Sequence, residues 1–365
     1  MIQTAKRLLH NFNAGPSVLP RDVFEQAAQA ILDFNGSGLS LLEIGHRTPQ
    51  FQAVVEEAVS LVRELMKLDD RHEVLFLQGG ATTQFMQVPM NLLDENEMAA
   101  FTDTGVWATK AIKEAKQFGH VEVVCSSREA NYTYLPKEFR VPPTARYLHL
   151  TTNNTIYGTQ WQDLSVFYNQ SVPLVADMSS DILSREINFN RFDLIYAGAQ
   201  KNVGAAGVTL VVVNKELLGR INRPIPTIMD YRRHIEADSL LNTPPVFAIY
   251  VCLLTLRWLR DQGGVAAIEQ RNQRKAQLFY DTLDGLPLFR GTVAREDRSR
   301  MNAVFVMQDP ALEKEFLDLC KAEGMVGVKG HRSVGGFRVS LYNALTLESV
   351  QALTDLMKSF AAKKG

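Results

Sequence analysis

Two residues of opposite charge follow successive apolar runs in the middle of the sequence. The run 172–176 is followed by Asp177, and the run 192–197 leads through Gly198 to Lys201. Both runs have the length and composition of β-strands. Ligands of open α/β sheets bind beyond the carboxyl ends of the strands. We therefore expect the Asp177 carboxylate and the Lys201 amine to face one binding site.

A carboxylate and an amine in this arrangement suit the cofactor pyridoxal 5′-phosphate (PLP). PLP is held as a Schiff base on a lysine, while an acidic residue faces its pyridine nitrogen and keeps that nitrogen protonated. The lysine, once displaced by substrate, can act as the base that moves the α-proton. Taken singly, Asp177 could cap a helix and Lys201 could be a solvated lysine, but their joint placement favours the cofactor.

Three further stretches could complete a PLP site. The turn Q-G-G-A-T-T-Q-F follows the apolar run 74–77, and its backbone N–H groups, with the hydroxyl of Thr82 or Thr83, could cradle a phosphate. Trp107 follows the next apolar run and could stack on a pyridine ring. Thr155 could reach the ring oxygen. A capped tight turn, a core tryptophan and a turn threonine are the respective alternatives.

Five basic residues could recognise an anionic substrate. They are His46, Arg47, His331, Arg332 and Arg338. Guanidinium groups bind carboxylates and phosphates through paired hydrogen bonds, so the set suggests a small, doubly anionic substrate. A surface ion pair is the alternative for each residue.

Apolar runs of strand length alternate with helical patterns from residue 73 onward. This alternation predicts an α/β fold with a mainly parallel sheet of seven strands and helices on both faces. The predicted strands are 74–77, 98–102, 121–125, 146–150, 172–176, 192–197 and 208–213. Helical patterns cover 20–34, 49–66 and 246–260.

The sequence predicts more than one domain, because 365 residues exceed the usual size of a single one. We expect an N-terminal segment over 1–16, a large domain over 17–262 and a small α+β domain over 263–365. The boundary follows the break Gln262-Gly263-Gly264. Helices at 265–286, at 312–323 and from 347, with a strand at 302–307, are expected beyond it.

Composition indicates a soluble globular protein that binds small molecules. Hydrophobic residues make up 46% and charged residues 22%, and the net charge is −1, which argues against a nucleic-acid partner. Cys125, Cys252 and Cys320 show no disulfide or metal pattern, so core packing in a reducing compartment is expected. The N-terminus lacks a signal-peptide core and no run is long enough to span a membrane, so we expect a cytoplasmic protein.

With these residues in hand, the chain resembles the phosphoserine aminotransferase family, a branch of the class V aminotransferases with fold type I. The resemblance covers essentially the whole length. It rests on the motifs F-N-A-G-P-S-V-L-P, G-H-R, G-G-A-T-T-Q-F, V-A-D-M-S-S-D-I-L-S, Y-A-G-A-Q-K-N-V-G, L-N-T-P-P and G-H-R-S-V-G-G-F-R-V-S-L-Y-N-A.

The resemblance implies specific residue roles. Lys201 carries PLP, Asp177 pairs with the ring nitrogen, Trp107 stacks on the ring and Thr155 bonds the ring hydroxyl. The implied phosphate ligands are Ala81, Thr82 and Gln200, with Asn242 and Thr243 from a second subunit of a homodimer. The implied substrate ligands are Arg47 for the carboxylate and His46, His331, Arg332 and Arg338 at or near the phosphate. Some members carry an arginine at the position of Thr82, so here recognition of the substrate phosphate should depend more on the other basic residues.

The implied reaction is reversible amino transfer between L-glutamate and 3-phosphooxypyruvate, giving 2-oxoglutarate and O-phospho-L-serine in serine biosynthesis, with ping-pong kinetics. Many bacterial relatives also act on a phosphorylated hydroxythreonine in pyridoxine synthesis. Serine:glyoxylate aminotransferases and cysteine desulfurases are the nearest rivals. Serine:glyoxylate aminotransferases need no set of basic residues for a substrate phosphate. Cysteine desulfurases need a nucleophilic cysteine on a mobile loop near the cofactor, and none of the three cysteines lies in an obvious loop of that kind. A non-catalytic binding protein would require neither Lys201 nor Asp177.

Overall fold

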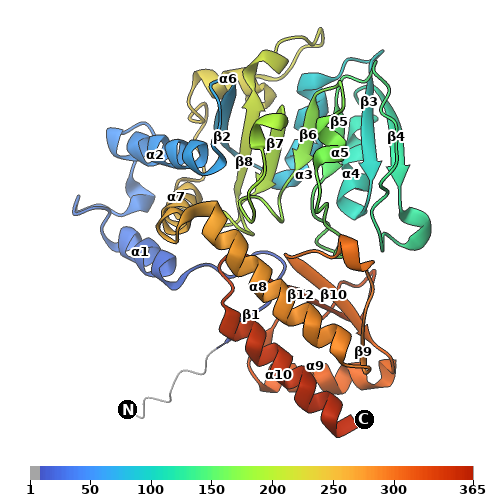
Figure 1. Ribbon diagram of the computed structural model, residues 1–365. Coiled ribbons are helices and arrows are strands. Elements are labelled where there is room, and N and C mark those ends of the chain that lie inside the picture. The colour runs from blue at the N-terminus through green and yellow to red at the C-terminus, as the bar shows by residue number, and fades with distance from the viewer. Residues whose placement is uncertain (1–8, 365) are drawn as a thin grey trace.

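A twisted sheet of seven strands forms the centre of the computed structural model, which describes residues 9–364 (Figure 1). Its strands, in spatial order, are β2 (His72–Gln78), β8 (Val208–Asn214), β7 (Leu194–Gly198), β6 (Leu174–Asp177), β5 (Leu148–Thr151), β3 (Met98–Asp103) and β4 (His120–Ser126). The prediction of seven strands in a mainly parallel sheet is confirmed. Only β8 breaks the pattern, because it runs antiparallel to both of its neighbours.

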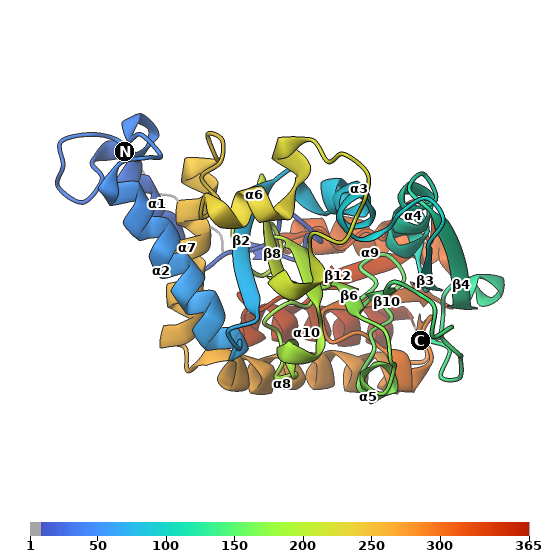
Figure 2. The same cartoon turned by 90° about the horizontal axis from the view of Figure 1, so that it is seen from above.

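Each face of this sheet is covered by its own set of helices (Figure 2). One face packs on α2 (Pro49–Met66), α7 (Val246–Asp261) and the short α5 (Ser165–Tyr168), and the other on α3 (Gly80–Leu92), α4 (Val106–Ala115) and α6 (Tyr231–Glu236). Alternate residues of β2 show the reason: Val74 and Phe76 join one core, and Leu75 and Leu77 join the other.

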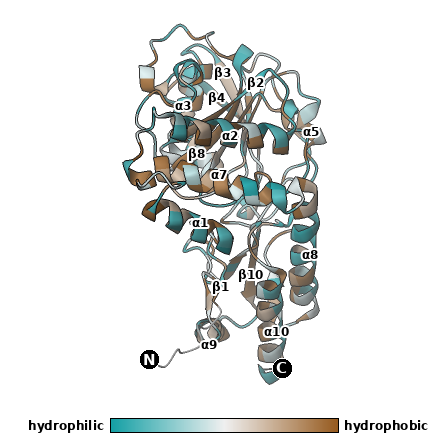
Figure 3. Cartoon of the chain, turned by 90° about the vertical axis from the view of Figure 1, so that its left-hand side faces the viewer, coloured by the Kyte–Doolittle hydropathy of each residue, from teal (hydrophilic) through white to brown (hydrophobic). Residues whose placement is uncertain are grey.

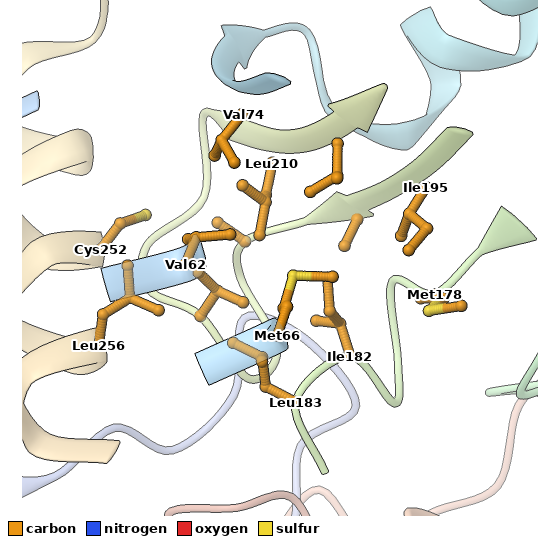
Figure 4. Close-up of a cluster of buried hydrophobic side chains, with 14 of the residues drawn as sticks. Val62, Met66, Val74, Met178, Ile182, Leu183, Ile195, Leu210, Cys252 and Leu256 are labelled. Atoms are coloured by element: carbon orange, nitrogen blue, oxygen red, sulfur yellow. The ribbon is translucent and has the colours of Figure 1, made fainter. Parts of the chain in front are cut away.

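The apolar side chains of the first core meet between the sheet and the helices α2 and α7. Val62 and Met66 of α2 point toward Leu210 of the sheet, and Cys252 of α7 closes the cluster (Figure 4). β8 is mostly apolar, whereas the covering helices carry both apolar and polar residues (Figure 3). Helix α1 (Arg21–Leu32) packs its buried Val23, with two alanines, on α7.

A smaller part of the chain has its own sheet and core. Its antiparallel strands are β9 (Phe289–Gly291), β10 (Asn302–Met307) and β12 (Phe337–Ser340), and its helices are α9 (Glu313–Ala322) and α10 (Leu347–Lys364). The strand β10 and both helices match the prediction. β9 and β12 were not predicted: β9 has only three residues, and the four residues of β12 alternate apolar and polar positions but follow directly on the glycine-rich stretch and are too few for a clear pattern.

The long helix α8 (Gly264–Gly285) connects the two parts. Val265 and Ile268 at its start belong to the first core, and Phe279 and Leu283 near its end belong to the second. The change from one core to the other therefore falls within α8, after Ile268, whereas the predicted division at 262/263 lies at the start of this helix and stays a prediction.

The N-terminal segment packs with the smaller part. β1 (His10–Asn11) pairs in parallel with β11 (Met325–Val326), and Phe12 is buried in the second core. Part of the predicted segment 1–16 lies outside the described residues. None of the described helices is long and apolar enough to cross a bilayer.

The three cysteines are unpaired. Cys252 and Cys320 are buried in the two cores, which confirms the expected packing role for both. Cys125 is half-buried on β4. Burial raises the pKa of the Cys252 thiol to about 12, so this group is a poor nucleophile.

Candidate active site

A cavity of about 450 Å³ lies beyond the carboxyl ends of the central strands. Its volume suits a small cofactor with a substrate. Nine of the predicted site residues line it together: Ala81, Thr82, Trp107, Thr155, Asp177, Gln200, Lys201, His331 and Arg338. The large part of the chain supplies the first seven, and the smaller part supplies His331 and Arg338. The prediction that the strand ends share one site is therefore confirmed.

Lys201 projects into this cavity just after β7. Its Nζ donates a hydrogen bond to Thr155 Oγ1 at 2.9 Å. Burial lowers the pKa of Lys201, and the charge of Arg338 acts in the same direction. The attraction of Asp177 and Asp181 partly opposes them, and the resulting pKa is about 8. The amine therefore loses its proton far more readily than a solvated lysine does.

Asp177 is the last residue of β6 and is only 4% exposed. The backbone N–H of Ser179 donates to its Oδ1 at 2.9 Å. Burial raises the pKa of Asp177 despite the hydrogen bonds from Ser179 and the nearby charge of Lys201. The surrounding protein groups do not fully offset the cost of burying the negative charge of Asp177. The carboxylate therefore suits a cationic ligand atom such as a protonated ring nitrogen.

The turn from β2 into α3 is shaped to receive an anion. Gly79 and Gly80 have φ values of 99° and 70°, and a Cβ on Gly79 would lie 2.1 Å from Thr83 Oγ1. Gly79 offers no side chain to cap α3, so the first N–H groups of that helix are available to a phosphate. Thr83 donates its hydroxyl to the Gly79 carbonyl, which leaves Thr82 as the threonine available to a ligand.

Trp107 lies in the first turn of α4, where it lines the cavity and also packs against the core on that face of the sheet. Lys110 Nζ lies 4.5 Å from the centre of its ring. The indole Nε1 of Trp107 is buried and has no hydrogen-bond partner among residues 9–364. The flat ring, the helix start, the uncompensated Asp177 and the Lys201 amine together fit PLP.

The N-terminal loop is a part of the site that sequence reasoning missed. Ser17 Oγ donates to the Lys201 carbonyl at 2.5 Å, and Ser17 N donates to the Gln200 carbonyl at 2.9 Å. Gly15 has a φ of 138°, and a Cβ there would lie 3.4 Å from Lys201 Cγ. No residue of the N-A-G-P-S stretch is among the predicted site residues. Its adjacent Gly and Pro were the available signal of a constrained turn.

Among the predicted substrate ligands, Arg338 and His331 reach the cavity. Arg338 Nη1 donates to the Thr155 carbonyl at 3.4 Å, and its Nε is buried with no partner in the described part of the chain. Burial lowers the pKa of Arg338. The remaining predicted residues lie outside the lining of the cavity: His46, Arg47, Arg332, Asn242 and Thr243.

Replacing Gly79 with alanine is expected to weaken PLP binding and to destabilise the fold by about 1–3 kcal/mol. The reason is the strained φ together with the clash with Thr83, which would displace the first turn of α3. Urea unfolding and a PLP titration measure the two effects. Gly285→Ala is the matched control, because a Cβ there meets nothing within 4 Å. Equal behaviour of the two variants would contradict the assignment of this turn.

Comparison with known proteins agrees with this geometry. Residues 9–353 match the family model "Aminotransferase class-V". A phosphoserine aminotransferase of Flavobacterium johnsoniae is 54% identical over 355 residues, which is 97% of this chain and 99% of the relative. The solved phosphoserine aminotransferase from Bacillus circulans subsp. alkalophilus is 44% identical with a TM-score of 0.94, over 98% of this chain and 99% of that one. Another solved phosphoserine aminotransferase, described for radiation damage of its Schiff base, also has a TM-score of 0.94 at 44% identity, over 98% of this chain and 100% of that one.

The fold and the site define a PLP-dependent transaminase of fold type I. The chain belongs to the class-V aminotransferase family, and within it to the phosphoserine aminotransferases.

Proposed function

We propose that this enzyme transfers an amino group reversibly between L-glutamate and 3-phosphooxypyruvate, giving 2-oxoglutarate and O-phospho-L-serine for serine biosynthesis. The observation that carries the proposal is a cavity that holds the Lys201 amine, the Asp177 carboxylate and the Arg338 guanidinium, whose buried Nε has no hydrogen-bond partner within residues 9–364. We assign the enzyme to the cytoplasm. A phosphorylated hydroxythreonine of pyridoxine biosynthesis is a candidate second substrate.

The shared cavity supports the PLP roles that the resemblance implies. Lys201 would bind PLP covalently, Asp177 would face the ring nitrogen, Trp107 would cover the ring and Thr155 would bond the ring hydroxyl. The phosphate ligands would be Ala81, Thr82 and Gln200. When bound, PLP supplies an electron sink for the electron pair left at the substrate α-carbon.

We assign proton transfer to the Lys201 amine. Its Nζ would take the proton from the α-carbon of the amino donor and deliver it to C4′ of the cofactor in the same half-reaction, and with the keto-acid acceptor it would move a proton in the opposite direction. A pKa of about 8 leaves a useful fraction of the amine uncharged near neutral pH. Thr155 Oγ1, at 2.9 Å, orients the amine toward the cavity.

The substrate carboxylate is best placed against Arg338. The Arg338 guanidinium is close enough to Lys201 to lower the pKa of that lysine. A carboxylate bound to Arg338 would therefore place the substrate α-carbon near the Lys201 amine. Arg338 Nε has no partner within residues 9–364, so the guanidinium can form a paired hydrogen bond with a carboxylate. The resemblance gave this role to Arg47, which is exposed and lies outside the cavity. We therefore propose that Arg338 binds the carboxylate and that Arg47 contributes to the phosphate site.

A homodimer would bring in the residues that lie away from the cavity. We propose that a second copy of the chain contributes Asn242 and Thr243 to the cofactor phosphate, and His46 and Arg47 to the substrate. Apolar side chains are exposed on α1 and in the segment just before His46: Phe24 at 49%, Leu32 at 76%, Leu39 at 48% and Leu42 at 63%. Such a face suits contact with another copy. Sedimentation of the purified protein tests the assembly. Mixing Lys201→Ala with Arg47→Ala subunits tests the sharing, since hybrid dimers should regain activity.

With glutamate as donor, we expect 3-phosphooxypyruvate to be used with a kcat/KM roughly 100-fold above that of hydroxypyruvate. Charge-assisted hydrogen bonds to the phosphate are worth about 1.5–3 kcal/mol each, and hydroxypyruvate cannot form them. A coupled assay for 2-oxoglutarate measures both acceptors, with glyoxylate as the third.

Equal use of the acceptors would keep the aminotransferase chemistry and remove the phosphate specificity, leaving a glyoxylate-type enzyme. Desulfuration is not supported by the site, because none of the three cysteines lines the cavity. A colourless protein with PLP present would favour a non-catalytic binding role.

A further inference from the structure

His331 lies in a loop that uses one of its two ring nitrogens internally. The backbone N–H of Ser333 donates to Nδ1 at 3.2 Å, and Ser333 Oγ lies 2.7 Å from the same nitrogen. A backbone N–H can only donate, so Nδ1 must be an acceptor without a proton. It follows that Ser333 Oγ also donates to Nδ1. The neutral ring then carries its proton on Nε2, the nitrogen that remains for a ligand in the cavity.

The surroundings of the ring favour this neutral form. Burial lowers the pKa of His331, and the charges of Arg338, Arg332 and Lys110 lower it further. These three charged groups are all cationic. A neutral ring avoids adding a fourth positive charge and still offers a hydrogen-bond donor.

Tyr157, in the large part of the chain, lies close to Ser333. Ser333 is near enough to act on the pKa of the Tyr157 hydroxyl, and the Tyr157 ring packs on Tyr132 with centroids 4.8 Å apart. Tyr132 in turn donates to Asp103 Oδ1 at 3.2 Å. The turn that carries Ser333 therefore lies beside a tyrosine pair of the large part of the chain.

We propose that Ser333 is a positioning residue that fixes the tautomer of His331, so that a neutral imidazole presents its Nε2–H to the phosphate of the acceptor. This inference rests on the proposed function. It explains how one position can serve two substrates: a neutral, oriented donor binds a phosphate and also the side-chain carboxylate of glutamate, without the full charge that would hold either one in the site.

Two substitutions of His331 separate the ring nitrogens. The amide nitrogen of glutamine reaches the position of Nε2, whereas that of asparagine reaches only the position of Nδ1. We expect His331→Gln to keep the KM for 3-phosphooxypyruvate within about fivefold of wild type, and His331→Asn to raise it roughly 10- to 100-fold, with kcat little changed in both. The reverse order would overturn the proposal.

Nitrogen-15 NMR of the histidine rings reads the tautomer without any turnover. The signal that disappears in His331→Gln is that of His331, and we expect it to show a proton on Nε2 at neutral pH. Ser333→Ala should raise the pKa of His331 toward that of a solvated histidine, because it removes a donor to the neutral ring, and Ser333→Thr should restore it.

The two readouts keep the inference separate from the proposed function. A protein that does not use the phosphorylated acceptor refutes the function, while the ring spectrum still tests the tautomer. A proton on Nδ1, a cationic ring at neutral pH or an unchanged titration in Ser333→Ala would each overturn the role of Ser333.

Discussion

Lys201→Ala should reduce transamination by more than about 10⁴-fold and leave the fold intact. The variant loses both the covalent attachment of PLP and the base that moves the α-proton, and each of these is worth orders of magnitude. Steady-state turnover with glutamate and 3-phosphooxypyruvate measures the effect. The control is Lys215→Ala, which removes an exposed lysine that pairs with Glu73 far from the cavity. Turnover of Lys201→Ala near the wild-type rate would refute the mechanism.

The same variant should not lose stability when PLP is absent. The folded pKa of Lys201, about 8, lies below the ordinary value of 10.5. Between these values the unfolded chain binds more protons than the native one, so stability rises with pH across this window. Below pH 8 the buried amine is therefore a net cost, which alanine removes. Thermal unfolding of the cofactor-free proteins at pH 7 should give a melting temperature for the variant equal to or above that of wild type.

Asp177→Asn should lower kcat by roughly 10²- to 10⁴-fold. An amide cannot hold a proton on the ring nitrogen by charge, so the electron sink is weakened. The fold should survive, because asparagine can still accept the Ser179 N–H at Oδ1. Asp355→Asn, at an exposed position on α10, is the control. Wild-type kcat in Asp177→Asn would show that the ring nitrogen needs no carboxylate.

Stability is expected to change in the opposite direction to activity in Asp177→Asn. The pKa of Asp177 is raised in the folded protein, so the native state holds its proton more tightly than the unfolded chain does. Stability therefore falls as pH rises from the ordinary value of 3.8 up through the raised pKa of the folded protein. The cofactor-free variant should unfold at a higher urea concentration than wild type. A lower midpoint would mean that the carboxylate stabilises the empty site.

The strand ends of the site were predictable, because buried parallel strands are continuous apolar runs that finish on polar residues. Asp177 and Lys201 are of this kind, and the structure brings them to one cavity. The direction of β8 was not predictable, since a strand buried on both faces has the same pattern in either orientation. β12, which carries Arg338, follows a run of glycines, and its pairing with β10 depends on a tertiary contact.

Two parts of the site could not be derived from local patterns. The loop around Gly15 and Ser17 acts through backbone contacts with residues far along the chain, and no periodicity marks such contacts. The tautomer of His331 depends on the turn geometry at Ser333, which a sequence does not display. Arg47 illustrates the reverse case: its residue type suggested an anion ligand, but its element lies away from the cavity of its own chain.

The pairing of β1 with β11 makes the order of synthesis differ from the order of assembly. His10 leaves the ribosome long before its partner Met325 is made. Until that strand pairs, β1 does not anchor the loop whose Ser17 donates to the Lys201 and Gln200 carbonyls. Contacts between distant segments form late and slowly. We therefore expect PLP to bind stably only after β1 and β11 have paired.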